Sequence, residues 1–275
     1  MSHRTLLSAA ELQALPPEKL LLIDVGFDLT DTSAGERAYA AAHLPGAHYL
    51  HLDRDLSAAK TGTNGRHPLP DRAAFATKMA ALGLSADSQV VAYDVQGGMV
   101  AARLWWMLRW IGHVAVAVLD GGQAAWTGAL TAALPVAQPG NFKLGEAAVG
   151  QVDAAGLRAL LGQVRLIDAR APERFRGEVE PLDAQAGHIP GASNRLFKMN
   201  LAADGRFKPA DQLKTEFSTL LGAHAPANVI HTCGSGVSAC HNLLAMEHAG
   251  LAGSVLYPGS WSEWSSDSHR PVANG

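Results

Sequence analysis

Short apolar runs that end in a polar residue recur along the chain and predict buried strands. Four runs have this form, namely Leu20–Asp24, Val90–Asp94, Arg165–Asp168 and Asn228–Cys233, and a fifth, Val114–Leu119, is followed directly by Asp120. Runs of this length, rich in leucine and β-branched residues, are typical of parallel strands buried on both faces. Helical patterns lie between them, and Ala101–His113 is the strongest. The alternation predicts an α/β protein with mainly parallel sheets flanked by helices.

The order of these patterns repeats after about 140 residues, which indicates a tandem duplicated domain. His43-Leu-Pro-Gly-Ala47 returns as His188-Ile-Pro-Gly-Ala192. We expect an N-terminal domain over residues 1–135 and a C-terminal domain over residues 150–275. The segment between them is rich in Pro, Gly, Ala and Gln and is expected to be a linker.

Composition narrows the function classes. Hydrophobic residues make up 48% of the 275 residues and charged residues 17%, as in a globular protein. The net charge of −3 implies no general attraction to nucleic acid, and no apolar run is long enough to span a bilayer. We expect no secretory signal in the first residues. The two cysteines exclude a disulfide scaffold and suit the reducing cytoplasm, where we expect the protein.

Cys233 closes the last apolar run of the second half. Small residues follow it (Gly234, Ser235, Gly236, Val237 and Ser238), and a helical pattern then begins. Such a loop turns backbone N–H groups toward one point, where the helix dipole adds partial positive charge. A thiol there should lose its proton more readily and act as a nucleophile. The matching position in the first half is Asp94, so we expect a catalytic C-terminal domain and an inactive N-terminal one.

Taken in order, these motifs resemble the two-domain rhodanese-type sulfurtransferases over nearly the whole chain. The motifs that carry the resemblance are the paired His-x-Pro-Gly-Ala boxes, Asp168-Ala-Arg170, Arg174-Phe-Arg-Gly177, the loop from Cys233 to Ser238, and Gly259–Trp264. The resemblance implies that Cys233 takes up sulfane sulfur as a persulfide. It also implies transfer of that sulfur to a thiophilic acceptor such as cyanide, a small thiol or reduced thioredoxin.

The resemblance further implies a 3-mercaptopyruvate donor, because thiosulfate enzymes of the family carry basic residues after the cysteine and this loop does not. Thiosulfate:cyanide sulfur transfer is the alternative main activity. By the same resemblance, Ser235, His67 and Asp53 handle the proton, and Arg174 holds the donor carboxylate together with the loop residues Gly234, Gly236, Val237 and Ser238. The second substrate arginine usual in this group is missing from residues 178–186, and Arg176 and Arg195 are candidates to replace it.

Several residues have plainer interpretations. Without the resemblance, His67 would be a loop histidine and Asp53 a turn acid. His43 and His188 occur in both halves, so we expect structural roles, and we expect Cys240 to be a packed small hydrophobe.

The sequence also bears on metal sites, cofactor sites and rival functions. No histidine pair has the spacing and thiolate partners of a metal site, and no phosphate-binding glycine motif occurs, so we expect neither a metal nor a cofactor. The rival functions are a cysteine phosphatase or arsenate reductase, which needs an arginine where Ser238 stands, and a non-enzymatic persulfide carrier.

Overall fold

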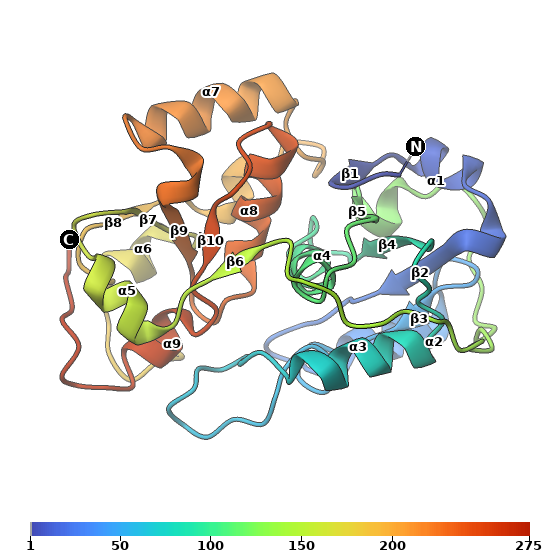
Figure 1. Ribbon diagram of the computed structural model, residues 1–275, viewed down its shortest axis with the longest axis horizontal. Helices are drawn as coiled ribbons and strands as arrows, with labels where there is room; N and C mark the ends of the chain where they lie inside the picture. Colours follow the sequence, from blue (N-terminus) through green and yellow to red (C-terminus); the bar gives the residue numbers. More distant parts are fainter. Residues whose placement is uncertain (1) are drawn as a thin grey trace. The chain divides into compact units, whose positions relative to one another are not determined.

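The computed structural model describes residues 2–275, which form two units of the same design (Figure 1). One unit comprises the residues up to Ala58, Pro70–Ala148 and Ala203–Phe207. The other comprises Ala59–Leu69, Val149–Ala202 and Lys208–Gly275. Each unit contains one five-stranded sheet whose strand pairs are all parallel. The predicted α/β class with tandem parallel sheets is confirmed.

The first unit has the strand order β1-β5-β4-β2-β3. Its strands are β1 (Leu6–Leu7), β2 (Leu20–Asp24), β3 (His48–Tyr49), β4 (Gln89–Tyr93) and β5 (Val116–Leu119). Its helices are α1 (Ala9–Ala14), α2 (Ala34–Ala41), α3 (Arg72–Ala81) and α4 (Ala101–Trp110), with 3₁₀ turns η1 (Pro17–Lys19) and η2 (Gly122–Ala125).

The second unit has the strand order β6-β10-β9-β7-β8, which is the first order with each strand replaced by its counterpart. Its strands are β6 (Gly150–Gln151), β7 (Arg165–Asp168), β8 (Ala192–Asn194), β9 (Val229–Thr232) and β10 (Val255–Leu256). Its helices are α5 (Ala154–Leu160), α6 (Pro172–Phe175), α7 (Ala210–Leu221), α8 (Ser238–His248) and α9 (Ser260–Trp264), with 3₁₀ turns η3 (Phe197–Asn200) and η4 (Pro226–Asn228). The duplication read from the sequence is thus a duplication of topology.

The central strands lie where the apolar runs predict them. The helix predicted over Ala101–His113 ends earlier, at Trp110, because Gly112 takes a φ of +96° that no helix continues through. The edge strands β1 and β6 are two residues long and were not predicted, since a strand of that length has no periodicity to read.

The sheet of the second unit buries both faces, and the sequence alternates accordingly. Leu166 and Ile230 join a core cluster with Trp261 and Trp264 of α9. The next residue along β9, His231, points the other way and its Nε2 lies 3.2 Å from the Met246 sulfur of α8. Helices therefore cover each face, and the loop after β9 emerges at the carboxyl edge of the sheet (Figure 1).

The paired His-x-Pro-Gly-Ala boxes have matching structural roles. His43 Nδ1 hydrogen-bonds the Tyr39 carbonyl at 2.7 Å and its ring stacks on Tyr39. His188 Nδ1 bonds the Phe175 carbonyl at 2.8 Å and stacks on Phe175. Both rings are buried. The structure therefore supports the structural role expected for these histidines.

Residues 2–275 were expected to contain neither a membrane span nor a metal site. Within that range no helix is both long and apolar enough to cross a bilayer. In the same range no group of three or more His, Cys, Asp or Glu side chains is placed to hold a metal ion.

Candidate active site

Cys233 lies between β9 and α8, and the turn that enters α9 holds its backbone. The Cys233 N–H donates to Ser260 Oγ at 3.1 Å, and the Trp261 N–H donates to the Cys233 carbonyl at 2.9 Å. The Ser262 N–H donates to the Gly234 carbonyl at 2.9 Å. These bonds fix the first two residues of the loop, which is the positioning that a nucleophile needs.

Ser260, which accepts one of these bonds, has a strained backbone conformation. Its φ is +53°, and within residues 2–275 no other non-glycine residue has a positive φ. The counterpart in the first unit is Gly122, with a φ of +58°. Ser260 Oγ also donates to the Tyr257 carbonyl at 2.9 Å. The serine thus occupies a glycine conformation while its hydroxyl holds Cys233, and such strain often marks a functional site.

The loop that follows the central strand has a counterpart in each unit, and the first unit shows what this loop can bind. Asp94 follows β4 as Cys233 follows β9, and its carboxylate accepts four backbone N–H groups, from Gln96, Gly98, Val100 and Ala101, at 2.8–3.0 Å. This loop is therefore an anion cradle filled by its own side chain. In the second unit the Gly236 N–H donates to Cys233 Sγ at 3.1 Å. A sulfur that carries negative charge is suited to this place.

Gly236 is required by the close approach of two backbone segments. A Cβ built on it would lie 2.2 Å from the Pro258 carbonyl oxygen, and its φ is +75°. Only glycine meets both conditions. The Gly-Ser-Gly sequence that suggested a tight loop is thus explained at its second glycine.

His67 reaches this loop from the first half of the sequence. Its Nδ1 shares a hydrogen bond of 2.7 Å with Ser235 Oγ, and both side chains are buried. The segment Ala59–Leu69 belongs to the same unit as Cys233, and the Arg66 N–H donates to Ser262 Oγ at 3.0 Å. The expected meeting of His67 with Ser235 is therefore present in the geometry.

Asp53 belongs to the other unit. Its backbone N–H donates to His51 Nδ1 at 3.1 Å. Its expected action on His67 stays a prediction.

Arg174 lies beside the loop, as expected, and is paired with acids. Its Nη2 donates to Glu180 at 2.6 Å and to Asp183 at 3.1 Å. A Cβ added at Gly234 would lie 3.5 Å from its Nη1, so the guanidinium borders the residue after Cys233. Its Nε is buried and has no acceptor among the described residues. A buried donor without an acceptor is unusual, and the expected role of Arg174 in holding the donor carboxylate stays a prediction.

Neither arginine suggested as a replacement for the missing one is at the loop. Arg195 is buried, pairs with Glu216 at 2.8 Å and lies over the Phe217 ring. Arg176 is exposed and pairs with Glu178 at 2.7 Å. Both side chains are engaged with acids of their own, so nothing in the structure supports either as the replacement.

Arg66 is the site residue that sequence reasoning missed. A Cβ added at Gly234 would lie 2.8 Å from its Nη2. The sequence does hold one indication of its role, because Arg66 directly precedes the candidate His67. Arg170 also borders Gly234, but its guanidinium donates from Nε to Asp168 Oδ1 and from Nη2 to Asp168 Oδ2 and lies over Trp261, which points to a structural role.

Cys240 is a packed residue, as expected. It is fully buried on α8, and its thiol donates weakly to the Gly236 carbonyl at 3.4 Å. The neighbouring His231 is also fully buried. Burial, together with the charge of Arg195, lowers the pKa of His231 to about 3, so the ring stays neutral at working pH.

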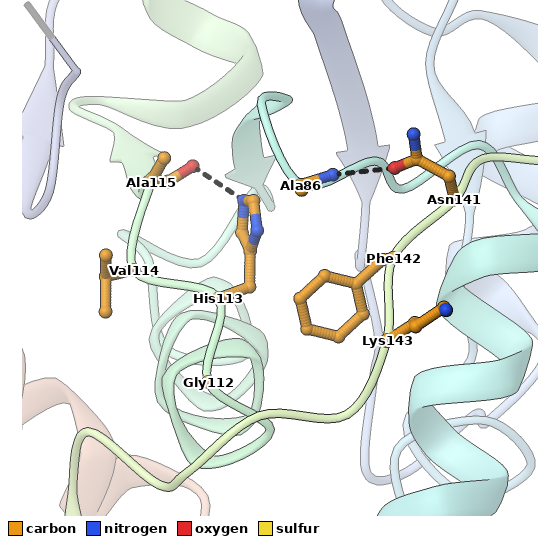
Figure 2. A pocket seen from close by; sticks show the side chains of 8 residues that line it. All are labelled: Ala86, Gly112, His113, Val114, Ala115, Asn141, Phe142 and Lys143. Carbon is orange, nitrogen blue, oxygen red and sulfur yellow. Dashed lines mark hydrogen bonds between the residues drawn. The ribbon is translucent and has the colours of Figure 1, made fainter.

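A hollow of about 360 Å³ in the first unit contains neither cysteine (Figure 2). His113 and Phe142 form its wall, and His113 Nε2 faces the Ala115 carbonyl at 3.2 Å. The Asn141 side-chain oxygen accepts the Ala86 N–H at 3.1 Å. Burial lowers the pKa of His113. These polar groups serve the fold, and no convergent chemistry is aimed into the hollow.

Comparison with known proteins gives one consistent family. Residues 8–129 and 153–267 each match the Rhodanese-like domain. A Pseudomonas aeruginosa protein named "Probable 3-mercaptopyruvate sulfurtransferase" is 51% identical and covers 100% of both chains. The thiosulfate sulfurtransferase of Cricetulus griseus is 32% identical, covering 89% of this chain and 84% of its own. The solved structure of 3-mercaptopyruvate sulfurtransferase from Leishmania major superposes with a TM-score of 0.84 at 29% identity, covering 95% of this chain and 74% of its own.

Proposed function

The chain belongs to the family of two-domain rhodanese-type sulfurtransferases, and we propose that it moves sulfur from 3-mercaptopyruvate through a persulfide on Cys233. The observation that carries the proposal is the loop around Cys233. Its counterpart cradles the Asp94 carboxylate with four N–H groups, and its own sulfur accepts the Gly236 N–H. Stabilised negative charge on sulfur is what both the attacking thiolate and the persulfide require.

Sulfur uptake follows from the chemistry of the donor. The Cys233 thiolate attacks the thiol sulfur of 3-mercaptopyruvate and forms the S–S bond. The carbon–sulfur bond breaks, and its electron pair leaves on the enolate of pyruvate. The persulfide keeps the donor's sulfur, and the loop N–H groups bear its charge. Attack of an acceptor such as cyanide on the outer sulfur forms thiocyanate and restores the Cys233 thiolate.

The leaving enolate needs a proton, and we assign its transfer to His67 and Ser235. The proton that the donor thiol loses as the persulfide becomes charged passes to the His67 imidazole, and from there through the Ser235 hydroxyl to the enolate carbon; the imidazole and the hydroxyl share a 2.7 Å hydrogen bond. We assign Asp53 to the orientation of His67, as acids orient imidazoles in comparable relays. Thiosulfate loses sulfite, which needs no such proton at carbon.

That difference gives a test. Replacing His67 with alanine should reduce kcat with 3-mercaptopyruvate by about 100-fold, the usual contribution of general acid catalysis, and should reduce thiosulfate turnover far less. Initial rates with both donors under the same acceptor measure this. Equal losses with the two donors would refute the relay.

The donor carboxylate is assigned to Arg174, whose buried Nε has no acceptor among the described residues. We assign the loop residues Gly234, Gly236, Val237 and Ser238 to the donor site as well. The loop carries no lysine or arginine from Gly234 to Ser238, which favours a monoanionic donor over thiosulfate. A phosphatase needs an arginine there for its oxyanion, and we expect no hydrolysis of an aryl phosphate.

For the acceptor we propose a thiol, with reduced thioredoxin as the protein candidate. Neither Cys233 nor Cys240 forms a disulfide. Because the cycle requires a reduced Cys233, we place the enzyme in the cytoplasm. Recovery of the protein in the periplasmic or extracellular fraction would contradict this placement.

A further inference from the structure

The arginines beside Cys233 are matched one for one by buried acids of the same unit. The cations are Arg66, Arg170 and Arg174, and the anions are Asp168, Glu180 and Asp183. Asp168 holds Arg170 below the site. The remaining acids lie within residues 178–186, where no arginine occurs.

Asp183 bridges the two cations that border the loop. Its Oδ1 accepts from Arg66 Nη1, and its Oδ2 accepts from Arg174 Nη2 at 3.1 Å. Its carboxylate is 3% exposed, and its backbone N–H donates to Glu180 Oε1 at 3.1 Å. Asp183 is therefore fixed in place and not a mobile surface acid.

The two guanidiniums meet at the residue that follows Cys233. From a Cβ added at Gly234, Arg66 Nη2 would lie 2.8 Å away and Arg174 Nη1 3.5 Å away. A donor whose sulfur is at Cys233 therefore places its anionic group near both. Asp183 and Glu180 bring their negative charges to these same two guanidiniums.

We propose that Asp183 is a specificity-determining residue: by bridging Arg66 and Arg174 it removes, together with Glu180, the net positive charge of the anion subsite beside Cys233, which disfavours dianionic sulfur donors relative to monoanionic ones. The second cation of that subsite is Arg66, supplied by the segment Ala59–Leu69. A dianion such as thiosulfate meets twice the repulsion from Asp183 that the carboxylate of 3-mercaptopyruvate meets. The inference rests on the proposed function, since it takes the Cys233 loop as the donor site.

The test replaces Asp183 with asparagine, which keeps the shape and one acceptor and removes the charge. The quantity measured is kcat/KM for each donor, because in a ping-pong reaction it reports only the loading of Cys233. We expect the ratio of thiosulfate to 3-mercaptopyruvate kcat/KM to rise on the order of tenfold, and the rise to shrink at high salt. D183E, which keeps the charge, should retain the wild-type ratio.

The matched control is Glu178→Gln, which removes an exposed carboxylate of the same segment that pairs only with Arg176 among the bonds found for it. A D183N ratio equal to that of E178Q, or a parallel loss with both donors in a variant whose thermal midpoint is unchanged, would overturn the inference. If D183N does not fold, Arg66→Gln supplies the second measurement. It should lower kcat/KM for both anionic donors but not for the uncharged amide of 3-mercaptopyruvate, and an equal loss with the amide would likewise overturn it. A wild-type protein inactive with both donors would instead refute the proposed function.

Discussion

At the scale of single residues, two positions hold the Cys233 loop through conformations that other side chains do not tolerate. Gly236 is pressed against the Pro258 carbonyl, and Ser260 takes a positive φ to hold the Cys233 N–H. The acid at position 94 was visible in the sequence as the twin of the cysteine. Its four N–H bonds, which reveal the loop as an anion cradle, required coordinates.

Gly236→Ala should lower kcat/KM by at least about 100-fold, because its methyl group would force the loop away from Pro258 and shift the Cys233 sulfur. The matched control is Gly250→Ala. Gly250 has a φ of +76° but open space around its Cβ, so it tests the backbone strain alone, which costs about 1 kcal/mol. Similar activity in the two variants would show that the contact with Pro258 does not position the cysteine.

Ser260→Gly should separate activity from stability. Glycine accepts the φ of +53° without strain, so the free energy of unfolding should change by less than about 1 kcal/mol, while loss of the bond to Cys233 lowers kcat. Ser260→Ala keeps the strain and loses the bond, and it should be less stable than Ser260→Gly. Thermal unfolding and initial rates measure both effects, and the reverse order of stability would contradict the interpretation.

At the scale of elements, the central strands of each sheet were readable because buried parallel strands are continuous apolar runs. β2, β7 and the body of α4 lie where these runs and the helical period place them. The pairing of Arg66 with Asp183 was not readable, because the two residues are 117 positions apart and no local pattern encodes such a contact. The meeting of His67 with Ser235 was reached only through the family resemblance.

The interior of β9 predicts a pH effect. The pKa of His231 falls from 6.5 to about 3 on folding, chiefly through burial. A group whose pKa is depressed in the folded state adds stability above pH 6.5, and that stability is lost as the pH falls toward 3 because only the unfolded ring is protonated. His231→Leu should therefore reduce the decline in the free energy of unfolding between pH 6.5 and 4 by roughly 1 kcal/mol or more, and thermal unfolding at each pH measures it. An unchanged pH profile would contradict the burial of a neutral ring.

At the scale of the whole molecule, the chain order and the two units differ at two segments, Ala59–Leu69 and Ala203–Phe207, and the first of these concerns the site. Ala59–Leu69 follows β3 in sequence, yet it belongs to the unit that contains Cys233 and brings Arg66 and His67 to it. Dividing the chain at a linker near residue 140 separates the two copies of the duplication, but it assigns Ala59–Leu69 to the first copy although this segment belongs to the unit of Cys233. We propose that residues 1–135 and 150–275 are homologous domains and that the first completes the site of the second.

Hydrogen exchange can assign the segment to its unit. Phe217→Ala should destabilise the second unit by about 3 kcal/mol or more through a buried cavity, and Phe75→Ala should do the same to the first. We expect the amides around Arg66 to exchange faster in the Phe217 variant than in the Phe75 variant. Acceleration only in the Phe75 variant would show that the segment follows the first unit.

The central claim is that Cys233 carries sulfur between donor and acceptor. Its most direct test is the mass of the Cys233 peptide after exposure of the protein to 3-mercaptopyruvate. We predict a gain of one sulfur atom on Cys233, its removal by cyanide with formation of thiocyanate, and no gain in Cys233→Ser. Turnover that survives in Cys233→Ser, or a sulfur gain confined to Cys240, would contradict the account.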